Sequence, residues 1–288
     1  MDFYLTAILQ GLCFAGIAFG IYISMKIFNI PDITTDGSYT LGGVVTGSML
    51  VHHQPGYMIM AAVLATGAIA GALTGIIHTK LKINALLAGI LVMTALYSVN
   101  LTILGRSNLP LLSMPTLFTS IELITNVNQN SLLILSVFVV AVTLLIGYLL
   151  KTDFGIAMRA TGNSEPMIRA LGVNTDRMKI IGLAIANALT ALSGYLITQL
   201  QGFADISMGI GIVIVGLGSV IIAETLINWL QITSVWLSLI LVLGGAIIFQ
   251  MVLAFTLAIG VDANLLKMVT AIFVLLVVGL PRLASRRA

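Results

Sequence analysis

The 288-residue chain is poor in charge, since only 8% of its residues are Asp, Glu, Lys or Arg. Soluble domains carry about 25% charged residues, because their surfaces must be hydrated. A soluble fold is therefore excluded, and the 59% hydrophobic composition predicts a protein that crosses a membrane several times. Its apolar runs are continuous rather than alternating, which excludes a transmembrane β-barrel.

Cysteine and the signatures of catalysis are also scarce. The single cysteine, Cys13, cannot form an intrachain disulfide and is expected to be a small packing residue. The sequence has no H-E-x-x-H, no G-x-S-x-G and no Walker-type G-x-x-x-x-G-K-[ST]. We therefore expect no catalytic residues, no cofactor and no nucleotide site in this chain. His52, His53 and His78 have no convergent donors around them in the sequence, so no metal site is predicted.

Long apolar runs define the expected architecture. Runs near the length of about 20 residues that crosses a bilayer lie at 4–28, 57–78, 84–104, 131–150, 178–201, 232–256 and 263–281. Two further runs, 38–51 and 209–228, are interrupted by glycine and are expected to be broken or re-entrant. The predicted fold class is all-α, a single polytopic helical bundle over residues 1–288 with about eight to ten membrane segments.

The basic residues orient this bundle. They gather in the loop 151–177, in the turn with Lys80 and Lys82, and in the tail with Arg282, Arg286 and Arg287. The positive-inside rule places all three regions, and so the C-terminus, on the cytoplasmic side. The 105–130 loop is then external and 178–201 runs outward. After residue 205 the chain must cross the membrane an odd number of times to bring its tail back inside.

Polar residues inside or beside the apolar runs are expected to form hydrogen bonds between helices, which is the usual role of such residues in membranes. They are Asn84, Asn100, Asn187, Gln199 and Glu224. Glu224 is the most suggestive of function, because it is ionisable, although it can equally face the cytoplasmic rim.

Local signals in the cytoplasmic loop predict a short helix at about 164–171. Asn163 or Ser164 can cap its start, and proline and an acidic residue suit the first turn of "SEPMIRALG". Leu171 and Gly172 form an ordinary helix stop. Such a helix is too short to be stable alone, so it is expected to pack against something. Local physics leaves two readings open, a solvated loop or a docking element for a cytoplasmic partner.

The segment that begins "DFGIAMRATGNSEPMIRALGVNTDRMK" closely resembles the permease subunits of ABC importers of the branched-chain amino acid/ribose type. "PDITTDGSYTLGG" and "HTKLKINALLAGILVMTALYSVNLTILGRSNLPLL" resemble the subgroup often associated with tryptophan and tyrosine uptake. The resemblance covers nearly the whole chain. It implies a multi-pass protein of the bacterial plasma membrane with no ATP site of its own.

The same resemblance implies partners. ATP would be hydrolysed by separate cytoplasmic ATPase subunits, a second permease copy would complete a dimer, taken to be a homodimer, and a solute-binding protein would dock outside. No nucleic-acid partner is expected. Within the loop, "RATGNSEPMIRALGV" resembles the coupling helix that enters a groove of the ATPase. The residues assigned to this contact are Gly162, Asn163, Ser164, Glu165, Pro166, Arg169, Leu171 and Gly172.

A polar insert, "IPDITTDGSYTLGG" at 30–43, interrupts the lipid-soluble sequence. Residues 18–43 align weakly with 191–216, which predicts a parallel internal repeat and places the N-terminus in the cytoplasm. Interrupted segments at matching positions in two halves point to a transport pathway, because unwound backbone at depth must be buried in protein or line a water-filled cavity. The predicted pathway residues are Asp32, Thr34, Thr35, Asp36, Ser38, Asp205 and Ser207. The alternative is that Asp32 and Asp205 only cap helices at the outer interface.

Two classes of function are weighed. The first is the permease of an ATP-driven importer for amino acids of the aromatic type, with nucleosides or other small polar solutes left open. The second is a secondary transporter driven by an ion gradient, which the paired broken segments alone would suit equally. An intramembrane enzyme has no motif in its favour.

Overall fold

The computed structural model describes residues 2–112, 114–121, 124–262 and 265–285. Over these residues the chain is a helical bundle with one two-stranded sheet. Its elements are α1 (Asp2–Cys13), α2 (Ala15–Ile21), the π-helix η1 (Tyr22–Ile27), α3 (Thr34–Val51), α4 (Gly56–Lys80), α5 (Ala85–Leu104), β1 (Asn108–Pro110), α6 (Leu117–Ser120), α7 (Val127–Lys151), α8 (Asp153–Asn163), α9 (Glu165–Ala170), α10 (Thr175–Gln201), β2 (Phe203–Asp205), α11 (Ile212–Trp229), α12 (Val235–Ala258) and α13 (Leu266–Ser285).

The membrane spans follow the apolar runs of the sequence. Within the described residues, 7 helices are long and apolar enough to cross a bilayer, and the first combines α1, α2 and η1 from Phe3 to Ile27. Adding α3 and α13 brings the membrane segments into the predicted range. The all-α, multi-pass fold class is confirmed.

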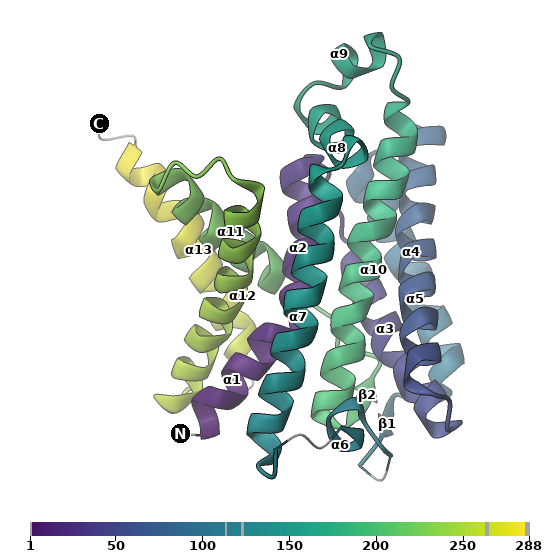
Figure 1. Cartoon of the computed structure of the whole chain (residues 1–288), viewed down its shortest axis with the longest axis vertical. Helices are drawn as coiled ribbons and strands as arrows, with labels where there is room; N and C mark the ends of the chain where they lie inside the picture. The colour runs from purple at the N-terminus through teal and green to yellow at the C-terminus, as the bar shows by residue number, and fades with distance from the viewer. Residues whose placement is uncertain (1, 113, 122–123, 263–264, 286–288) are drawn as a thin grey trace.

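Helix α10 forms the centre of the larger part of the bundle, between α2, α3 and α4 (Figure 1). Glycines let these backbones approach closely, as is common between membrane helices. A Cβ on Gly42 of α3 would lie 2.0 Å from the Ala191 carbonyl oxygen, and one on Gly71 of α4 would lie 2.1 Å from that of Leu183. Helices α11, α12 and α13 pack together beside this part and contact it mainly through α1 and α2, and also through α7 and α3.

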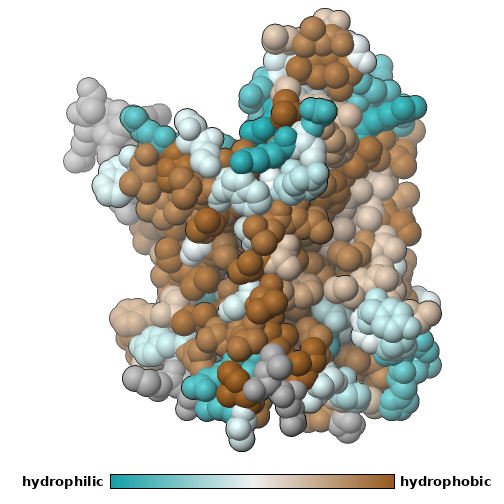
Figure 2. Space-filling model, in the orientation of Figure 1, coloured by the Kyte–Doolittle hydropathy of each residue, from teal (hydrophilic) through white to brown (hydrophobic). Residues whose placement is uncertain are grey.

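The two ends of the bundle differ. Helices α8 and α9 project from one end, and α6 with the antiparallel pair β1–β2 lies at the other (Figure 1). Figure 2 shows hydrophilic residues gathered at both ends of an apolar middle, which is the surface expected of a membrane-spanning bundle. Because the basic loop contains α8 and α9, we refer to their end as the cytoplasmic end.

The N-terminus lies at the end of the bundle opposite α8 and α9, so it does not share a side with the basic loop as the prediction of two cytoplasmic termini requires (Figure 1). Phe3 shares a cavity wall with Leu257 and Leu266, which flank the α12–α13 turn. The other end of the same span, Ile27, touches Gly162 in the cytoplasmic loop. The first span therefore runs toward the end that carries α8 and α9, and α13 also ends toward that side (Figure 1).

The predicted parallel repeat is also wrong. Gly16 approaches Leu189 and Ser193, whereas Gly20 approaches Ala186 and Thr190. As the first helix advances, its contacts on α10 move backward, so the aligned segments run antiparallel. The alignment rested on few identities between apolar stretches, and such stretches match easily by chance.

The predicted interruptions exist, but they lie at the edges of the glycine-rich runs. Helices α3 and α11 are each continuous over 18 residues despite their glycines. The non-helical backbone lies just before them, at residues 28–33 and 202–211. Each break contains aspartate, which accepts the hydrogen bonds that the interrupted backbone would otherwise leave unmade.

Candidate translocation and coupling sites

The first break is held by a buried carboxylate. Asp32 is 2% exposed, and its Oδ1 accepts a hydrogen bond from the backbone N–H of Thr34 at 2.9 Å. Its Oδ2 accepts another from Asn187 Nδ2 of α10 at 2.7 Å, and Asn187 Oδ1 accepts from Ser38 Oγ at 2.7 Å. Asn187 thus joins two residues of the polar insert to the central helix.

Two threonines complete this internal network. The hydroxyls of Thr34 and Thr74 lie 2.7 Å apart, so α3 is also tied to α4. Thr35 Oγ1 donates to the carbonyl of Asp32 at 3.3 Å. Four of the predicted pathway residues, Asp32, Thr34, Thr35 and Ser38, are therefore buried and engaged inside the protomer in this conformation.

Asp36 joins the two breaks to each other. Its Oδ2 accepts from the N–H of Gly211 at 3.0 Å, and its Oδ1 accepts from the N–H of Val213 at 2.9 Å. These N–H groups open α11, where the helix dipole also favours a negative charge. Gly209 packs so closely that a Cβ there would lie 2.0 Å from the Asp36 carbonyl oxygen. The polar insert and the second break, although not parts of a parallel repeat, meet in space.

Asp205 and Ser207 lie elsewhere, beside the small sheet at the outer end. Asp205 Oδ1 accepts from the N–H of Ser207 at 2.7 Å, and its Oδ2 accepts from Asn108 Nδ2 of β1 at 3.2 Å. Asp205 therefore fits the helix-end reading at the outer interface, whereas the buried Asp32 between α3 and α10 does not. The chain gives these two aspartates different surroundings.

Beside Asp36 the structure contains a cavity of about 310 Å³. It lies between α3, α5 and the segment 206–210, and Tyr97, Asn100 and Ile210 are among the residues that line it. A second space of similar volume lies at the outer end, between the α3–α4 turn, α6 and α10.

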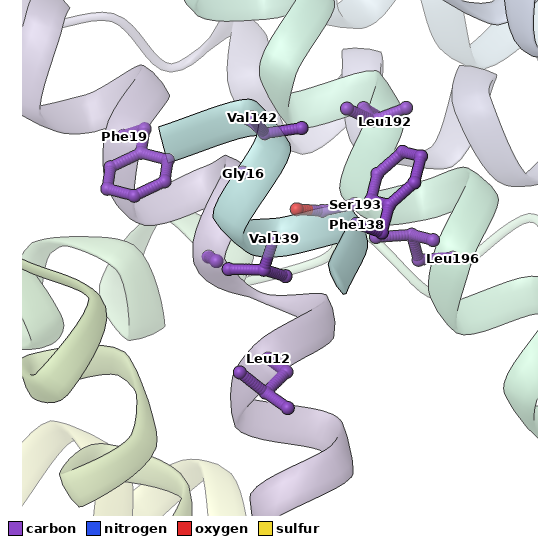
Figure 3. A pocket seen from close by; sticks show the side chains of 10 residues that line it. Leu12, Gly16, Phe19, Phe138, Val139, Val142, Leu192, Ser193 and Leu196 are labelled. Atoms are coloured by element: carbon purple, nitrogen blue, oxygen red, sulfur yellow. The ribbon is translucent and has the colours of Figure 1, made fainter. Parts of the chain in front are cut away.

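A further void between α2, α7 and α10 is too small for a solute. Its volume is about 10 Å³, near the minimum for a single water molecule. Figure 3 shows that apolar side chains surround it, with Ser193 as the polar exception. The Ser193 hydroxyl oxygen already accepts a hydrogen bond from the N–H of Ile17 at 3.0 Å. This space is a packing gap rather than a binding site.

The predicted loop helix is present as α9, which begins at Glu165 after an N-cap at Ser164, with proline in its first turn. Gly172 adopts a left-handed conformation with φ +86°, which glycine tolerates readily, and the Val173 N–H returns to the Ile168 carbonyl at 3.3 Å. The predicted start and stop are both confirmed. Ser164 makes no side-chain cap hydrogen bond, so its role as N-cap is positional.

An ionic network fixes α9 to the membrane helices. Glu165 pairs with Arg169 at 2.9 Å and with Lys179 of α10 at 2.6 Å. Arg169 also reaches Asp176 of α10 at 3.1 Å, and Asp176 lies 3.8 Å from Lys80 at the end of α4. The hydrogen bond from Lys179, with its positive charge, lowers the pKa of Glu165 below its ordinary value.

The outward side of α9 is apolar. Met167 is 64% exposed and Leu171 is 69% exposed, and Pro166 and Ala170 are exposed beside them. The charged residues of α9 thus bind α10, while the apolar residues face outward from the tip of the molecule. The sequence resemblance assigns Glu165 and Arg169 to an external contact and does not distinguish these charged residues, which bind α10, from the apolar residues that face outward.

The same loop touches the first break. Gly162, at the end of α8, lies so close to Ile27 that a Cβ on it would be 1.6 Å from the Ile27 carbonyl oxygen. The Gly162 carbonyl accepts a hydrogen bond from Asn29 Nδ2 at 3.2 Å. Nearby, Lys26 of η1 forms an ion pair with Glu224 of α11. Sequence reasoning singled out Glu224 but gave it no partner, because nothing local connects positions so far apart in the chain.

These features define a polytopic helical membrane protein with broken, polar membrane segments and a docked cytoplasmic loop helix. Residues 3–278 match the family model described as the branched-chain amino acid transport system permease component. The chain belongs to this family of transport permeases.

Two relatives cover nearly its whole length. A tyrosine transport system permease protein of Clostridioides difficile is 36% identical over 275 residues, covering 96% of this chain and 90% of that protein. An uncharacterized protein of Rickettsia prowazekii is 33% identical over 276 residues, covering 94% and 95%. A ribose import permease of Haemophilus influenzae is 24% identical over 230 residues, covering 78% and 69%. No solved structure matches the chain.

Proposed function

We propose that the chain is the permease subunit of an ATP-driven importer that carries an amino acid, of the aromatic class, across the bacterial plasma membrane. The observation that carries this proposal is the apolar tip of α9, which is fixed by ion pairs to α10. A force applied to the tip would reach α10 directly, and α4 through the pair between Asp176 and Lys80. The similarity to a tyrosine transport permease supports the solute class.

The partner at α9 would be a cytoplasmic ATPase subunit. Met167 and Leu171 are large apolar side chains exposed at the cytoplasmic end, where contact with water is unfavourable and a groove on another protein would cover them. ATP would bind and be hydrolysed on that subunit, and this chain would supply the solute route. At the outer end, the surface around β1 and β2 would receive the solute-binding protein.

A second copy of this chain would complete the route. The exposed surface of α5 carries Thr94, Tyr97, Ser98 and Thr102, spaced so that they share one side of the helix. Polar side chains on membrane helices usually face protein or a water-filled space rather than lipid. We therefore place α5 toward the other protomer of a homodimer, with the solute route between the two copies.

The coupling would act on the breaks. Gly162 joins the loop to the last residue of η1, Ile27, and Asp36 joins the α3 side of the first break to the start of α11. Closure of the ATPase dimer would shift α8 and α9, and the shift would reach both polar inserts. Coupling of this kind requires contacts that differ between two states.

Reconstituted uptake tests the proposal. The permease would be placed in vesicles with its ATPase subunits and binding protein, and uptake of radiolabelled tyrosine and tryptophan would be measured with and without ATP. We expect uptake only with ATP and all components. If the isolated chain instead accumulated solute under a proton or sodium gradient, the secondary-transporter alternative would be correct.

A further inference from the structure

One cavity is lined by Asn100, a residue whose buried side chain has an atom without a hydrogen-bond partner, and it lies on the side of α5 assigned above to the solute route. The cavity has a volume of about 310 Å³ and opens between α5 and the segment 206–210. This size falls at the lower end of the roughly 300–1,000 Å³ usual for small-molecule sites. Asn100 and Asp36 are the most polar residues that line it, and Met93, Tyr97 and Ile210 are among the largest side chains that line it.

Asn100 supplies the unpartnered atom. The residue is 1% exposed, and its Nδ2 donates to the Gly37 carbonyl at 3.3 Å, while its Oδ1 has no hydrogen-bond partner. The reverse orientation of the amide would bring two oxygens together, so Nδ2 must face Gly37 and Oδ1 must remain free. A buried acceptor without a partner is costly, and in native structures such an atom calls for a ligand, a water or a functional reason.

Apart from the Tyr97 hydroxyl, which can donate or accept, the other polar side chains of this cavity are also acceptors. The Asp36 carboxylate oxygens each accept one backbone N–H and have lone pairs left for another donor. The hydroxyls of Thr40 and Thr94 donate to the carbonyls of Asp36 and Ile90, so they can offer only lone pairs to the cavity. The residues that line this cavity include no lysine or arginine. The site is suited to a donor with positive charge.

We propose that this cavity is a transient subsite of the solute route that binds the ammonium group of the solute. The ammonium would donate to Asn100 Oδ1 and to the Asp36 carboxylate, and the apolar side chain of the solute would lie against Tyr97 and Met93. This inference rests on the proposed function and adds that the permease itself, not only the binding protein, recognises part of the solute. Asp36 also accepts hydrogen bonds from Gly211 and Val213. A solute bound in the subsite would therefore affect the start of α11.

The test distinguishes recognition of the ammonium group of the solute from recognition of its carboxylate. Purified permease–ATPase complex, without binding protein, would be titrated with tritiated tyramine, which has the ring and the ammonium of tyrosine but lacks the carboxylate. We expect saturable binding that tyrosine displaces and that 4-hydroxyphenylpropionate, which lacks the ammonium, does not. The absence of saturable tyramine binding, or equal displacement by both compounds, would overturn the proposal.

Variants locate the site. Asn100→Leu removes the free acceptor at similar volume and should weaken tyramine binding about tenfold or more, because a hydrogen bond to a charged group is lost. Val99→Leu lies on the same helix at a position that is 45% exposed, outside both the cavity and the α5 surface assigned to the solute route, and should bind as the unaltered protein does. If Asn100→Leu does not assemble, Ile210→Trp fills the cavity from a position that is 60% exposed and should abolish binding. Unchanged binding in either cavity variant would contradict the assignment.

Uptake distinguishes this inference from the proposed function. If ATP-driven uptake of tyrosine occurs but tyramine binding is absent, the subsite is wrong and the importer assignment stands. If tyramine binds as described but no ATP-driven uptake of any amino acid is found, the cavity recognises ammonium groups and the importer assignment fails.

Discussion

The carboxylate of Asp36 accepts a hydrogen bond from the backbone N–H of Gly211 at 3.0 Å. These residues stand far apart in the sequence. Asp36 lies shortly after the first non-helical break and Gly211 ends the second, so the contact brings the breaks together. A second bond at 2.9 Å, from the N–H of Val213, makes Asp36 the cap of α11. One side chain on α3 thus satisfies the open start of another membrane helix.

Removing this cap should destabilise the protein. Asp36→Ala leaves two N–H groups at the start of α11 without their acceptor, and loss of a capping residue typically costs about 0.5–2 kcal/mol. We expect a lower midpoint of thermal unfolding in detergent. Asp205→Ala, which removes partners at the end of β2, serves as the control and should shift the midpoint less. Equal shifts would show that the Asp36 contact adds nothing particular to stability.

Asn187 should be more important than its position in an apolar helix suggests. Asn187→Leu removes the 2.7 Å donor to the buried Asp32 and the 2.7 Å acceptor of Ser38. A hydrogen bond to a charged group contributes about 1.5–3 kcal/mol, so we expect a clear loss of folded protein. Ser38→Ala, which leaves the bond to Asp32 in place, should cost less. Measured unfolding midpoints in the opposite order would contradict this account of the break.

Gly162 should not tolerate a methyl group. Gly162→Ala would place a Cβ 1.6 Å from the Ile27 carbonyl oxygen, so α8 must move away from η1. Gly244→Ala offers a matched control, since nothing lies within 4 Å of the added atom and alanine favours a helix. We expect Gly162→Ala to lose ATP-driven uptake while Gly244→Ala keeps it. Normal uptake by both variants would refute the proposed link between the loop and the first break.

The ion pair between Glu165 and Lys179 should make the loop sensitive to acid. The folded-state pKa of Glu165 lies below 4.5, the ordinary value, mainly because Lys179 donates to its carboxylate. Its contribution to stability is therefore present above pH 4.5 and is lost as the pH falls through the lowered pKa. Protease cleavage within 160–175 should increase over this range in the unaltered protein. In Glu165→Gln the cleavage should be high already at neutral pH and change less with acid; an identical pH profile would contradict the pairing.

The membrane spans and the loop helix could be predicted from the sequence because their signals are local. An apolar run such as 84–104 must be a helix in lipid, and α5 is observed at Ala85–Leu104. Pro166 and Gly172 mark the two ends of α9 through their own backbone preferences. At each of these positions the local structure is determined by residues that are neighbours in the sequence.

The direction of the first span and the partners of the polar residues could not be predicted in this way. No basic residue precedes Lys26, so the positive-inside rule gave no firm orientation for α1 and a weak alignment decided it wrongly. The contacts of Asp36 with α11, of Asn187 with Asp32 and of Lys26 with Glu224 join distant segments. Only the packing of the whole bundle brings such residues together.

The apolar tip of α9 is the most direct test of the proposed coupling to an ATPase. Met167→Glu combined with Leu171→Glu changes two exposed side chains that are not part of the ionic network, so the loop should keep its structure. Leu81→Glu, in the α4–α5 turn at the same end, makes a similar change at a position that is 65% exposed. The measurement is ATP hydrolysis by the assembled complex when loaded binding protein is added. We expect the tip variant to insert normally but lose this stimulation while Leu81→Glu retains it; full stimulation in the tip variant would contradict the account.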